Sequence, residues 1–486
     1  MPAQVLANSS VVHLNDQYGT EADYQNAVKE LVQGLPGSTS TDKSVLEAHG
    51  KSFGDKQART VPTIVVFAQS TQDVVLAVNV SRKYRVPIIA YSGATSLERN
   101  HVATKIGGIC VDVSGMNRIL EIHEEDGDLV AQAGAKWVDI NATLKEKGIP
   151  LFFPLDPSLG ATLGGMMGCG CSGTNAVRYG TARAEWFLNA TVVLPSGEVI
   201  KTRRRARKCS AGFDGTHLFI GAEGTLGIVT EMTIRLAPVL PTRVAVVQFP
   251  DVHTASKAAI RLLNSGVGIQ CMELVDKIGM RALNLIALDL GRRATWTESD
   301  GLFFKLQGPT PLMLEETARV VREVSEMYGG TNFEYAQTEE EAVGLWEVRK
   351  HAMHAGAKLF PGLGHITTDV CVPISRLPDL IHETKLDFEK LGLYGIMGGH
   401  IGDGNFHSMM VYRSEEEHVK VDEACRRLVH RAIALDGTCT GEHGVGEGKR
   451  KYLVGELGQG TVDFIKTIKQ TLDPLNLFNP GKLYPD

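Results

Sequence analysis

Residues 223–236 read Glu-Gly-Thr-Leu-Gly-Ile-Val-Thr-Glu-Met-Thr-Ile-Arg-Leu, a glycine loop that runs directly into an alternating segment. From Ile228 to Leu236 every second side chain is apolar or threonine, and this period of two predicts a half-buried β-strand. Pro238 and Pro241 follow at once, and proline cannot continue a central strand. We therefore expect one domain to end near residue 240 and another to begin after it.

The chain before this boundary is typical of short strands mixed with amphipathic helices. Apolar side chains at helical spacing predict helices over residues 21–33 and 137–146, and Ser70 with Asp73 predicts a capping box that opens another helix. Short apolar runs predict strands and one hairpin, at residues 64–67, 86–91, 109–113, 119–122, 129–133 and 191–200.

Beyond the boundary, strands and helices alternate. Strands are expected at residues 244–249, 271–274 and 302–307, and helices at residues 256–264, 315–327 and 419–434. This rhythm predicts an α+β domain in which helices cover one face of a sheet.

Composition excludes several classes of protein. The chain has 486 residues, enough for several domains, and 50 basic against 56 acidic residues give a net charge of −6, which argues against a nucleic-acid partner. The only basic run, residues 201–208, is expected to be a solvated turn. Eight cysteines in so long a chain do not suggest a disulfide framework.

Membrane and targeting signals are also missing from the sequence. No stretch approaches the ~20 apolar residues that a transmembrane helix needs. Residues 1–15 have neither a secretory apolar region nor an Arg-rich presequence. We therefore expect a cytoplasmic protein, or one whose targeting peptide is already absent.

A pair of histidines flanks a turn signal in residues 399–407, Gly-His-Ile-Gly-Asp-Gly-Asn-Phe-His. The dipeptide Asp403-Gly404 is typical of a tight hairpin, which would set His400 opposite His407 on one face. Ile401 and Phe406 would then point the other way, into a core.

A second motif, residues 440–446 (Thr-Gly-Glu-His-Gly-Val-Gly), supplies a carboxylate and an imidazole on a flexible loop. His400, His407 and Glu442 together make a candidate divalent-metal site with open coordination positions. His443 is left over for proton transfer.

Three glycine-rich loops, at residues 92–97, 164–173 and 223–227, suggest backbone N–H groups gathered around phosphates. Residues 168–173 match the letters of the dinucleotide fingerprint G-x-G-x-x-G. No predicted strand leads into them, and no acidic residue follows at a strand end about 20 residues later. We therefore do not expect an NAD site.

These motifs carry a family resemblance. Residues 154–157 (Pro-Leu-Asp-Pro), 163–165, 172–175, 178–180 and 221–230 resemble the FAD domain of the vanillyl-alcohol oxidase and p-cresol methylhydroxylase (PCMH) superfamily. The histidine hairpin, the Glu442-His443 loop and the C-terminal Asn-Pro-Gly-Lys resemble its D-2-hydroxyacid dehydrogenase branch. The resemblance runs from about residue 60 to the end.

The resemblance implies an α+β fold with a two-subdomain PCMH-type FAD-binding domain and a ferredoxin-like substrate domain that carries a C-terminal helical segment. The implied parts are an N-terminal helical segment (1–59), the FAD domain (60–240), the substrate and metal domain (241–460) and a tail that returns to the FAD domain (461–486). Thr95 stands where some relatives attach the flavin to His, so FAD is expected to be non-covalent. The implied flavin contacts are Ser92, Gly93, Ala94, Thr95, Ser96, Leu97, Pro154, Asp156, Thr162, Gly165, Gly168, Ser172, Gly173, Tyr179, Gly180, Glu223, Gly227, Val229 and Asn479.

The resemblance also implies roles at the reacting centre. His400, His407 and Glu442 would hold zinc or manganese, between which the sequence cannot choose, and His443 would take the hydroxyl proton as hydride passes to flavin N5. Arg349 would bind the substrate carboxylate.

Three positions narrow the expected substrate. Relatives that act on D-2-hydroxyglutarate hold its second carboxylate with Lys, Asn and Thr, where this chain has Thr367, Met409 and Met353. No cation would offset the desolvation of a second carboxylate there. We therefore expect oxidation of a small D-2-hydroxyacid, D-lactate first, in a mitochondrial setting with cytochrome c as electron acceptor.

Several alternatives stay open at this point. D-2-hydroxyglutarate or glycolate could be the substrate within the same branch. The His and Glu set could instead serve a zinc hydrolase without flavin, or the chain could be a non-catalytic flavoprotein. The sequence does not decide the electron acceptor, or whether the chain forms a homodimer.

Overall fold

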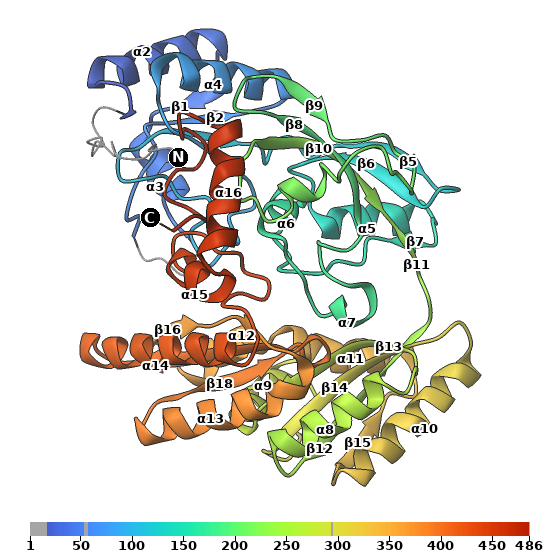
Figure 1. The fold of residues 1–486 in the computed structure, drawn as a ribbon. Coiled ribbons are helices and arrows are strands. Elements are labelled where there is room, and N and C mark those ends of the chain that lie inside the picture. The colour runs from blue at the N-terminus through green and yellow to red at the C-terminus, as the bar shows by residue number, and fades with distance from the viewer. Residues whose placement is uncertain (1–16, 53–56, 293–294, 486) are drawn as a thin grey trace, which may run out of the picture.

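The computed structural model describes residues 17–52, 57–292 and 295–485, except the side chains of Met353 and His354. Residues 1–15, considered above for targeting signals, lie outside this description. The first half of the chain forms the upper body in Figure 1, and a broad sheet with its helices forms the lower one. The chain has the expected α+β fold. Among the described residues, no helix is both long and apolar enough to cross a bilayer.

The upper body begins with a sheet in the order β1-β2-β4-β3. Its strands are β1 (Thr39–Ser40), β2 (Ile64–Phe67), β4 (Ile109–Asp112) and β3 (Ile88–Tyr91). Strands β2 and β3 both run parallel to β4. The connecting helix α4 (Thr71–Tyr84) starts with the predicted capping box of Ser70 and Asp73. Helix α2 (Glu21–Gly34) packs on α4, and α3 (Lys43–His49) lies against β2.

A second sheet contains residues 228–235 of the alternating segment. Its order is β5-β6-β10-β8-β9, with β5 (Ile119–His123), β6 (Asp128–Gln132), β10 (Ile228–Arg235), β8 (Phe187–Val193) and β9 (Val199–Lys201). Strand β10 lies between β6 and β8, and its alternate residues Ile228, Met232 and Ile234 are buried, as predicted. A small pairing joins β7 (Leu151–Phe152) to β11 (Ala237–Pro238). Helices α5 (Trp137–Glu146), α6 (Leu163–Cys169) and α7 (Ala176–Tyr179) precede β8.

The lower body is built on a sheet in the order β15-β12-β14-β13-β18-β19-β16. Its strands are β15 (Thr331–Tyr335), β12 (Thr242–Phe249), β14 (Asp300–Gln307), β13 (Ile269–Val275), β18 (Tyr394–Gly399), β19 (Asn405–Tyr412) and β16 (Gly364–Thr367), and β17 (Val370–Cys371) also pairs with β19. Successive side chains of β12 point to opposite faces of the sheet, so Val246 and Val247 lie in different hydrophobic cores.

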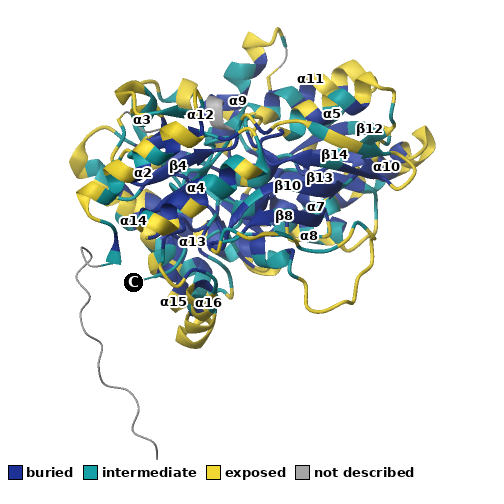
Figure 2. Ribbon diagram, turned by 90° about the horizontal axis from the view of Figure 1, so that it is seen from above, coloured by how far each residue is buried: buried dark blue, intermediate teal, exposed yellow. Residues whose placement is uncertain are grey.

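The expectation that helices cover one face of this sheet is wrong. One face packs against α8 (Val252–Leu263), α10 (Pro311–Met327), α13 (Leu377–Lys390) and α14 (Glu415–Ala434). The other packs against α9 (Lys277–Asp289), α11 (Glu339–Lys350) and α12 (Ala352–Leu359). The central strands are apolar on both sides, and every residue of β13 is buried, so both faces need a cover (Figure 2).

The predicted register of the histidine hairpin is also wrong. Gly398, not His400, is the partner of His407. Residues Ile401–Asp403 form a 3₁₀ turn, in which the Asp403 N–H donates to the His400 carbonyl at 2.9 Å. These local bonds lengthen the connection beyond two residues. Ile401 and Phe406 are nevertheless buried in the same core, as expected.

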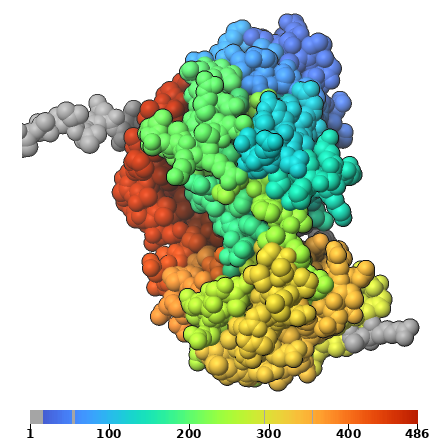
Figure 3. Space-filling view, turned by 90° about the vertical axis from the view of Figure 1, so that its right-hand side faces the viewer, coloured from blue at the N-terminus to red at the C-terminus, as the bar shows by residue number. Residues whose placement is uncertain are grey.

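The C-terminal segment returns to the upper body. Helices α15 (Leu453–Leu457) and α16 (Gln459–Leu472) lie along its side, in red in Figures 1 and 3. Leu477 and Phe478 are buried in the core of the first half, and the Ile88 N–H donates to the Leu477 carbonyl at 2.8 Å. Lys469 of α16 donates to the Thr225 and Phe478 carbonyls at 2.9 and 2.7 Å and to Asp473 at 2.5 Å.

We predict that Lys469→Met destabilises the protein by about 3–5 kcal/mol, because the buried Asp473 would lose its cation. Urea denaturation followed by far-UV circular dichroism measures this change. Lys466→Met, on the same helix but at a half-buried position, is the matched control and should cost less than about 1 kcal/mol. Equal effects of the two substitutions would contradict this role of Lys469.

Candidate active site

The two hairpin histidines face each other with their ring centroids 5.5 Å apart and nearly perpendicular. Nδ1 of His407 is 3.1 Å from the Thr368 carbonyl, and Nδ1 of His400 is 2.8 and 2.9 Å from the two carboxylate oxygens of Glu273. Because these oxygens accept, each Nδ1 carries the hydrogen. Each Nε2 is therefore left to face the centre of the site.

Glu442 completes this arrangement from the second motif. Its Oε1 lies 3.2 Å from Nε2 of His400 and 3.2 Å from Nε2 of His407. With both imidazoles neutral, all three atoms would be acceptors, so they need a proton or a metal ion among them. Metal bonds of about 2.0–2.2 Å would bring ligand atoms to about this separation. These residues could hold a divalent ion.

Burial and charge act strongly on this set. Burial alone would lower the pKa of His400, but Glu273 and Glu442 outweigh it and raise that pKa well above the ordinary value. Burial would likewise raise the pKa of Glu442, but His400 and His407 hold it well below its usual range. In the protein without a bound ion, the carboxylate therefore stays negative and attracts a cation.

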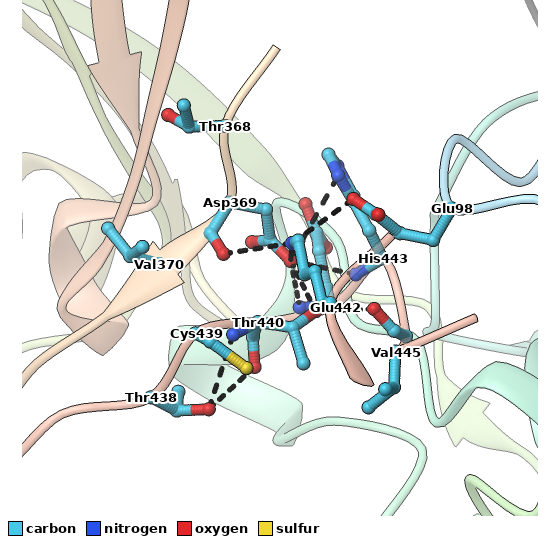
Figure 4. Close-up of polar contacts among 12 residues, drawn as sticks. Glu98, Thr368, Asp369, Val370, Thr438, Cys439, Thr440, Glu442, His443 and Val445 are labelled. Carbon is cyan, nitrogen blue, oxygen red and sulfur yellow. Dashed lines mark hydrogen bonds and ion pairs between the residues drawn. The ribbon is translucent and has the colours of Figure 1, made fainter. Parts of the chain in front are cut away.

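Asp369 fixes the loop that carries Glu442 and His443 (Figure 4). Its Oδ2 accepts from the backbone N–H groups of both residues at 2.9 Å and from the Thr440 hydroxyl at 2.9 Å. Its Oδ1 accepts from the Asn405 amide at 2.8 Å. Burial would raise the pKa of Asp369, but His443, Lys449 and His407 hold it far below normal. A fully buried anion thus sets the backbone of the second motif.

His443 lies beside His407, with the rings stacked 5.3 Å apart. Nδ1 of His443 is buried without a hydrogen-bond partner among the described residues, and Asp369 Oδ2 is 4.0 Å from it. Burial lowers the pKa of His443 to about 4, despite the attraction of Asp369. The imidazole is therefore neutral at neutral pH and is able to accept a proton.

Arg349, near the end of α11, is joined to His400 through a shared partner. Its guanidinium forms an ion pair with the fully buried Glu273, which also holds His400. Nε of Arg349 is buried without a partner among the described residues. This arrangement leaves one N–H of the guanidinium without an acceptor among the described residues.

Two of the three positions expected to narrow the substrate, Thr367 and Met409, lie on neighbouring strands. Thr367 of β16 and Ile396 of β18 are both register partners of Met409 on β19. The Met409 side chain lies over Gly356 of α12, where a Cβ would collide with it. Met409 is two residues beyond His407, so both side chains face the same side of the sheet. The Met353 side chain lies outside the described residues.

The glycine loops of the upper body approach one another. Ser92, which opens the loop 92–97, accepts from the Thr162 hydroxyl at 2.8 Å. The Gly168 carbonyl accepts from the Glu223 N–H at 2.9 Å. The dinucleotide-like stretch 168–173 begins in the last turn of helix α6, and no strand leads into it, as expected.

Ser172, in the glycine loop 164–173, contacts Glu442, one of the three candidate metal ligands. The Ser172 hydroxyl donates to Oε2 of Glu442 at 2.6 Å. The loop expected to contact flavin and the carboxylate expected to bind metal are therefore in direct contact.

Other predicted flavin residues stand around these loops. Asp156 accepts from the Thr174 hydroxyl at 2.6 Å and from the Asn175 N–H at 3.0 Å, and burial raises its pKa to about 6. The Asn175 amide also donates to the Pro154 carbonyl at 2.9 Å. Gly165 lies in α6, Gly173 adjoins Asp156, and Gly180 ends α7.

Three of the predicted flavin contacts, Tyr179, Gly227 and Val229, interact with residues of strands β14 or β8. The Tyr179 hydroxyl is hydrogen-bonded to the Gln307 side chain of β14 in the lower body. Gly227 packs closely against Val192 of β8, and Val229 is also paired with Val192. The hydrogen bond of Tyr179 and the close packing at Gly227 account for these two residue types without a ligand.

Asn479 joins the tail to the loops. Its amide donates to the carbonyls of Asn100 and Glu223 at 2.7 and 2.8 Å. The Glu223 carboxylate accepts from the N–H groups of Val445 and Gly446 at 2.6 and 2.8 Å, and burial raises its pKa to about 7. Both bodies and the tail therefore meet beside His443.

Sequence reasoning missed Glu273, Asp369 and Lys449. A carboxylate inside the apolar strand of residues 269–275 is unusual, and this could have indicated a buried partner for Glu273. Asp369 and Lys449 carry no comparable local signal, because their partners come from distant segments.

Comparison with known proteins decides the family. Residues 241–483 match the model described as FAD linked oxidases, C-terminal domain, and residues 62–203 match the model described as FAD binding domain. The chain belongs to the FAD-linked oxidases. This FAD-linked oxidase is therefore an oxidoreductase, as expected, and the alternative of a zinc hydrolase is wrong.

Two relatives and one solved structure illustrate the similarity. D-lactate dehydrogenase (cytochrome), mitochondrial, of Arabidopsis thaliana is 40% identical over 96% of this chain and 82% of its own length. D-lactate dehydrogenase (cytochrome) 1, mitochondrial, of Saccharomyces cerevisiae is 39% identical over 94% and 79%. The structure of p-cresol methylhydroxylase has a TM-score of 0.77 at 17% identity, covering 96% of this chain and 98% of that one. This last likeness concerns the fold alone, and with the two family models it confirms the expected PCMH-type fold.

We predict that His443 stays neutral at neutral pH in the ion-free protein and takes up a proton only near pH 4, because burial disfavours the imidazolium. Carbon-detected NMR of histidine-labelled protein measures the titration, and His443→Gln assigns the signal. Protonation of His443 at or above pH 6.5 would contradict the burial described here.

Proposed function

We propose that this FAD-linked oxidase is a divalent-ion-dependent D-lactate dehydrogenase that oxidises small D-2-hydroxyacids to 2-oxoacids. The observation that carries the proposal is the convergence of His400, His407 and Glu442 on one point, beside His443 and the glycine loop of Ser172. The names of relatives at 38–40% identity support D-lactate as the substrate. We assign the flavin to residues 60–240 with the tail from 461, and the substrate and ion to residues 241–460.

The donor set fits a divalent ion. Both imidazoles present Nε2, their Nδ1 atoms are held by Glu273 and Thr368, and the Glu442 carboxylate is negative without an ion. Such outer partners fix the orientation of histidine ligands. A bound zinc or manganese ion would supply positive charge beside the substrate hydroxyl and so favour loss of its proton.

The upper body fits a polar cofactor at the place where its loops meet. Asn479 Oδ1 is buried there without a partner among the described residues. Buried polar atoms of this kind need a hydrogen-bonding group. FAD would supply the acceptor for the hydride that leaves the substrate carbon.

His443 is the proposed base. With its Nδ1 hydrogen turned toward Asp369 Oδ2, 4.0 Å away, Nε2 is the nitrogen left to accept the hydroxyl proton. The buried negative charge of Asp369 would then stabilise the imidazolium that forms. A neutral His443 in the resting protein is the form that this role requires.

Arg349 and the strand residues would select the substrate. The unpartnered Nε of Arg349 supports binding of the carboxylate next to the reacting carbon. Met409, two residues beyond His407, and its cross-strand partner Ile396 present apolar surface on the same side of the sheet as His407. A methyl tail fits this wall, whereas a second carboxylate would be desolvated without a cation.

The electron acceptor and location rest on the relatives. Several are named as cytochrome enzymes and as mitochondrial. We therefore propose a cytochrome as the acceptor, with cytochrome c the first to test, and a mitochondrial site of action.

We predict that anaerobic D-lactate bleaches the flavin absorbance and that L-lactate does not. His443→Asn should slow the bleaching by about 10²–10⁴-fold, because the hydroxyl proton loses its acceptor, while FAD stays bound. Stopped-flow absorbance measures the rate, and the spectrum before mixing reports the bound flavin.

Three outcomes would contradict the proposal. Faster bleaching by D-2-hydroxyglutarate than by D-lactate would reassign the substrate. Bound flavin that no hydroxyacid reduces would indicate a non-catalytic flavoprotein. Bleaching by the His443→Asn variant at the wild-type rate would exclude His443 as the base.

We predict that the double substitution Thr367→Lys and Met409→Asn raises kcat/KM for D-2-hydroxyglutarate relative to D-lactate by about tenfold or more, because the second carboxylate would gain a cation and a donor. Steady-state kinetics on both substrates measure the ratio. Met409→Leu, which keeps the wall apolar, is the control and should preserve the preference for D-lactate. An unchanged ratio in the double variant would show that this wall does not face the substrate.

A further inference from the structure

Lys449 is a buried cation between two carboxylates from opposite bodies. Its Nζ lies 3.3 Å from Oε1 of Glu98, which follows the glycine loop 92–97. The same Nζ donates to the Asp369 carbonyl at 3.2 Å and lies 3.5 Å from Asp369 Oδ2. The side chains of Lys449 and Glu98 are only 8% and 11% exposed, and that of Asp369 is not exposed at all. Removing one partner of a contact so well shielded from solvent leaves a buried charge uncompensated, which costs more than breaking a surface ion pair.

The two ends of this contact hold different parts of the site. Asp369 fixes the backbone of Glu442 and His443, as described above. Glu98 lies in the connection between the predicted flavin loop and Asn100, whose carbonyl accepts from Asn479. Lys449 therefore links the segment expected to hold flavin with the segment expected to hold the ion and the base.

Backbone contacts reinforce the same link. The Glu447 N–H donates to the Glu98 carbonyl at 2.9 Å. Gly446 has a positive φ of 50°, and a Cβ at this position would collide with that carbonyl. Only glycine allows the two segments to approach so closely. A shift of residues 98–100 would therefore displace residues 446–449.

We propose that Lys449 is a positioning residue that couples the flavin loop to the Glu442-His443 loop, so that FAD and the divalent ion bind cooperatively. The proposal rests on the proposed function, since it takes both groups as ligands of this chain. Bound FAD would fix the segment that carries Glu98, and the bound ion would fix the Glu442-His443 loop, which Asp369 holds. Because Lys449 contacts both carboxylates, fixing either segment favours the binding conformation of the other. Because coupling between two sites is reciprocal, removal of the ion must weaken FAD binding by the same factor that removal of FAD weakens ion binding.

The test uses the FAD-loaded full-length protein. The Kd of FAD is measured from the rise in flavin fluorescence on dilution, once with saturating Mn²⁺ and once after EDTA treatment. For the wild type we expect the Kd to be about fivefold or more weaker without the ion. The quantity compared is the ratio of the Kd of FAD without the ion to the Kd with saturating Mn²⁺. For Glu98→Gln, which keeps the side-chain shape but removes the charge, we expect this ratio to fall close to one.

Lys449→Met gives a second, stronger change. The ratio should again fall close to one. Titration calorimetry should show Mn²⁺ binding to the FAD-loaded protein weakened by about 10–100-fold, because Asp369, which holds the backbone of Glu442, would lose its cation. The matched control is Lys385→Met, which breaks a lysine–aspartate pair of 3.2 Å with Asp300 on the lower sheet. The control should keep the wild-type ratio and affinity.

A wild-type ratio near one overturns the coupling, and so does a Glu98→Gln variant that keeps the wild-type ratio. Absence of Mn²⁺ binding to the wild type overturns it as well. Bleaching of the flavin by D-lactate is independent of these results. A ratio near one with normal bleaching rejects only the coupling, whereas a large ratio without bleaching rejects only the proposed activity.

Discussion

The rest of this structure depends on the buried negative charge of Glu442. A carboxylate removed from water is costly unless positive groups or hydrogen-bond donors surround it. Here His400 and His407 face one oxygen, and the Ser172 hydroxyl donates to the other. The first two come from the lower sheet and the third from a glycine loop of the upper body. The need to satisfy one carboxylate thus brings distant segments together.

A second buried anion, Asp369, keeps this arrangement in register. It accepts from the backbone of Glu442 and His443 and is balanced by Lys449. Glu273 plays a similar part on the other side, where it holds both His400 and Arg349. The groups proposed to bind the ion, the proton and the substrate carboxylate are therefore oriented by two buried carboxylates, Glu273 and Asp369. Their buried positions allow little alternative geometry.

Much of the fold could be predicted from the sequence, because local patterns determine it. The alternation of residues 228–236, the capping box of Ser70 and the helix of residues 137–146 each depend on side chains close together in the chain. The predicted hairpin register was wrong because the 3₁₀ turn of residues 401–403 competes with a tight turn, and Asp403-Gly404 alone does not distinguish them. The second layer of helices was missed because short apolar strands look alike whether one face or both are covered.

The functional site likewise contains residues that the sequence identifies and residues that it does not. His400, His407, Glu442 and His443 lie in recognisable motifs, so the sequence identifies them, although only the structure shows how closely they meet. Glu273, Asp369, Lys449 and Glu98 act through partners more than 40 residues away. The strand sequence around Glu273 indicates only that this carboxylate needs a partner, and nothing in the sequence identifies the partner of any of the four. Residues that orient a site are harder to predict than residues that form it.

Anomalous X-ray scattering from crystals of the active, FAD-loaded protein tests the central claim most directly. The account predicts one divalent ion per chain, bound by Nε2 of His400, Nε2 of His407 and the Glu442 carboxylate. Active protein without a stoichiometric ion, or with its ion bound elsewhere, would contradict it.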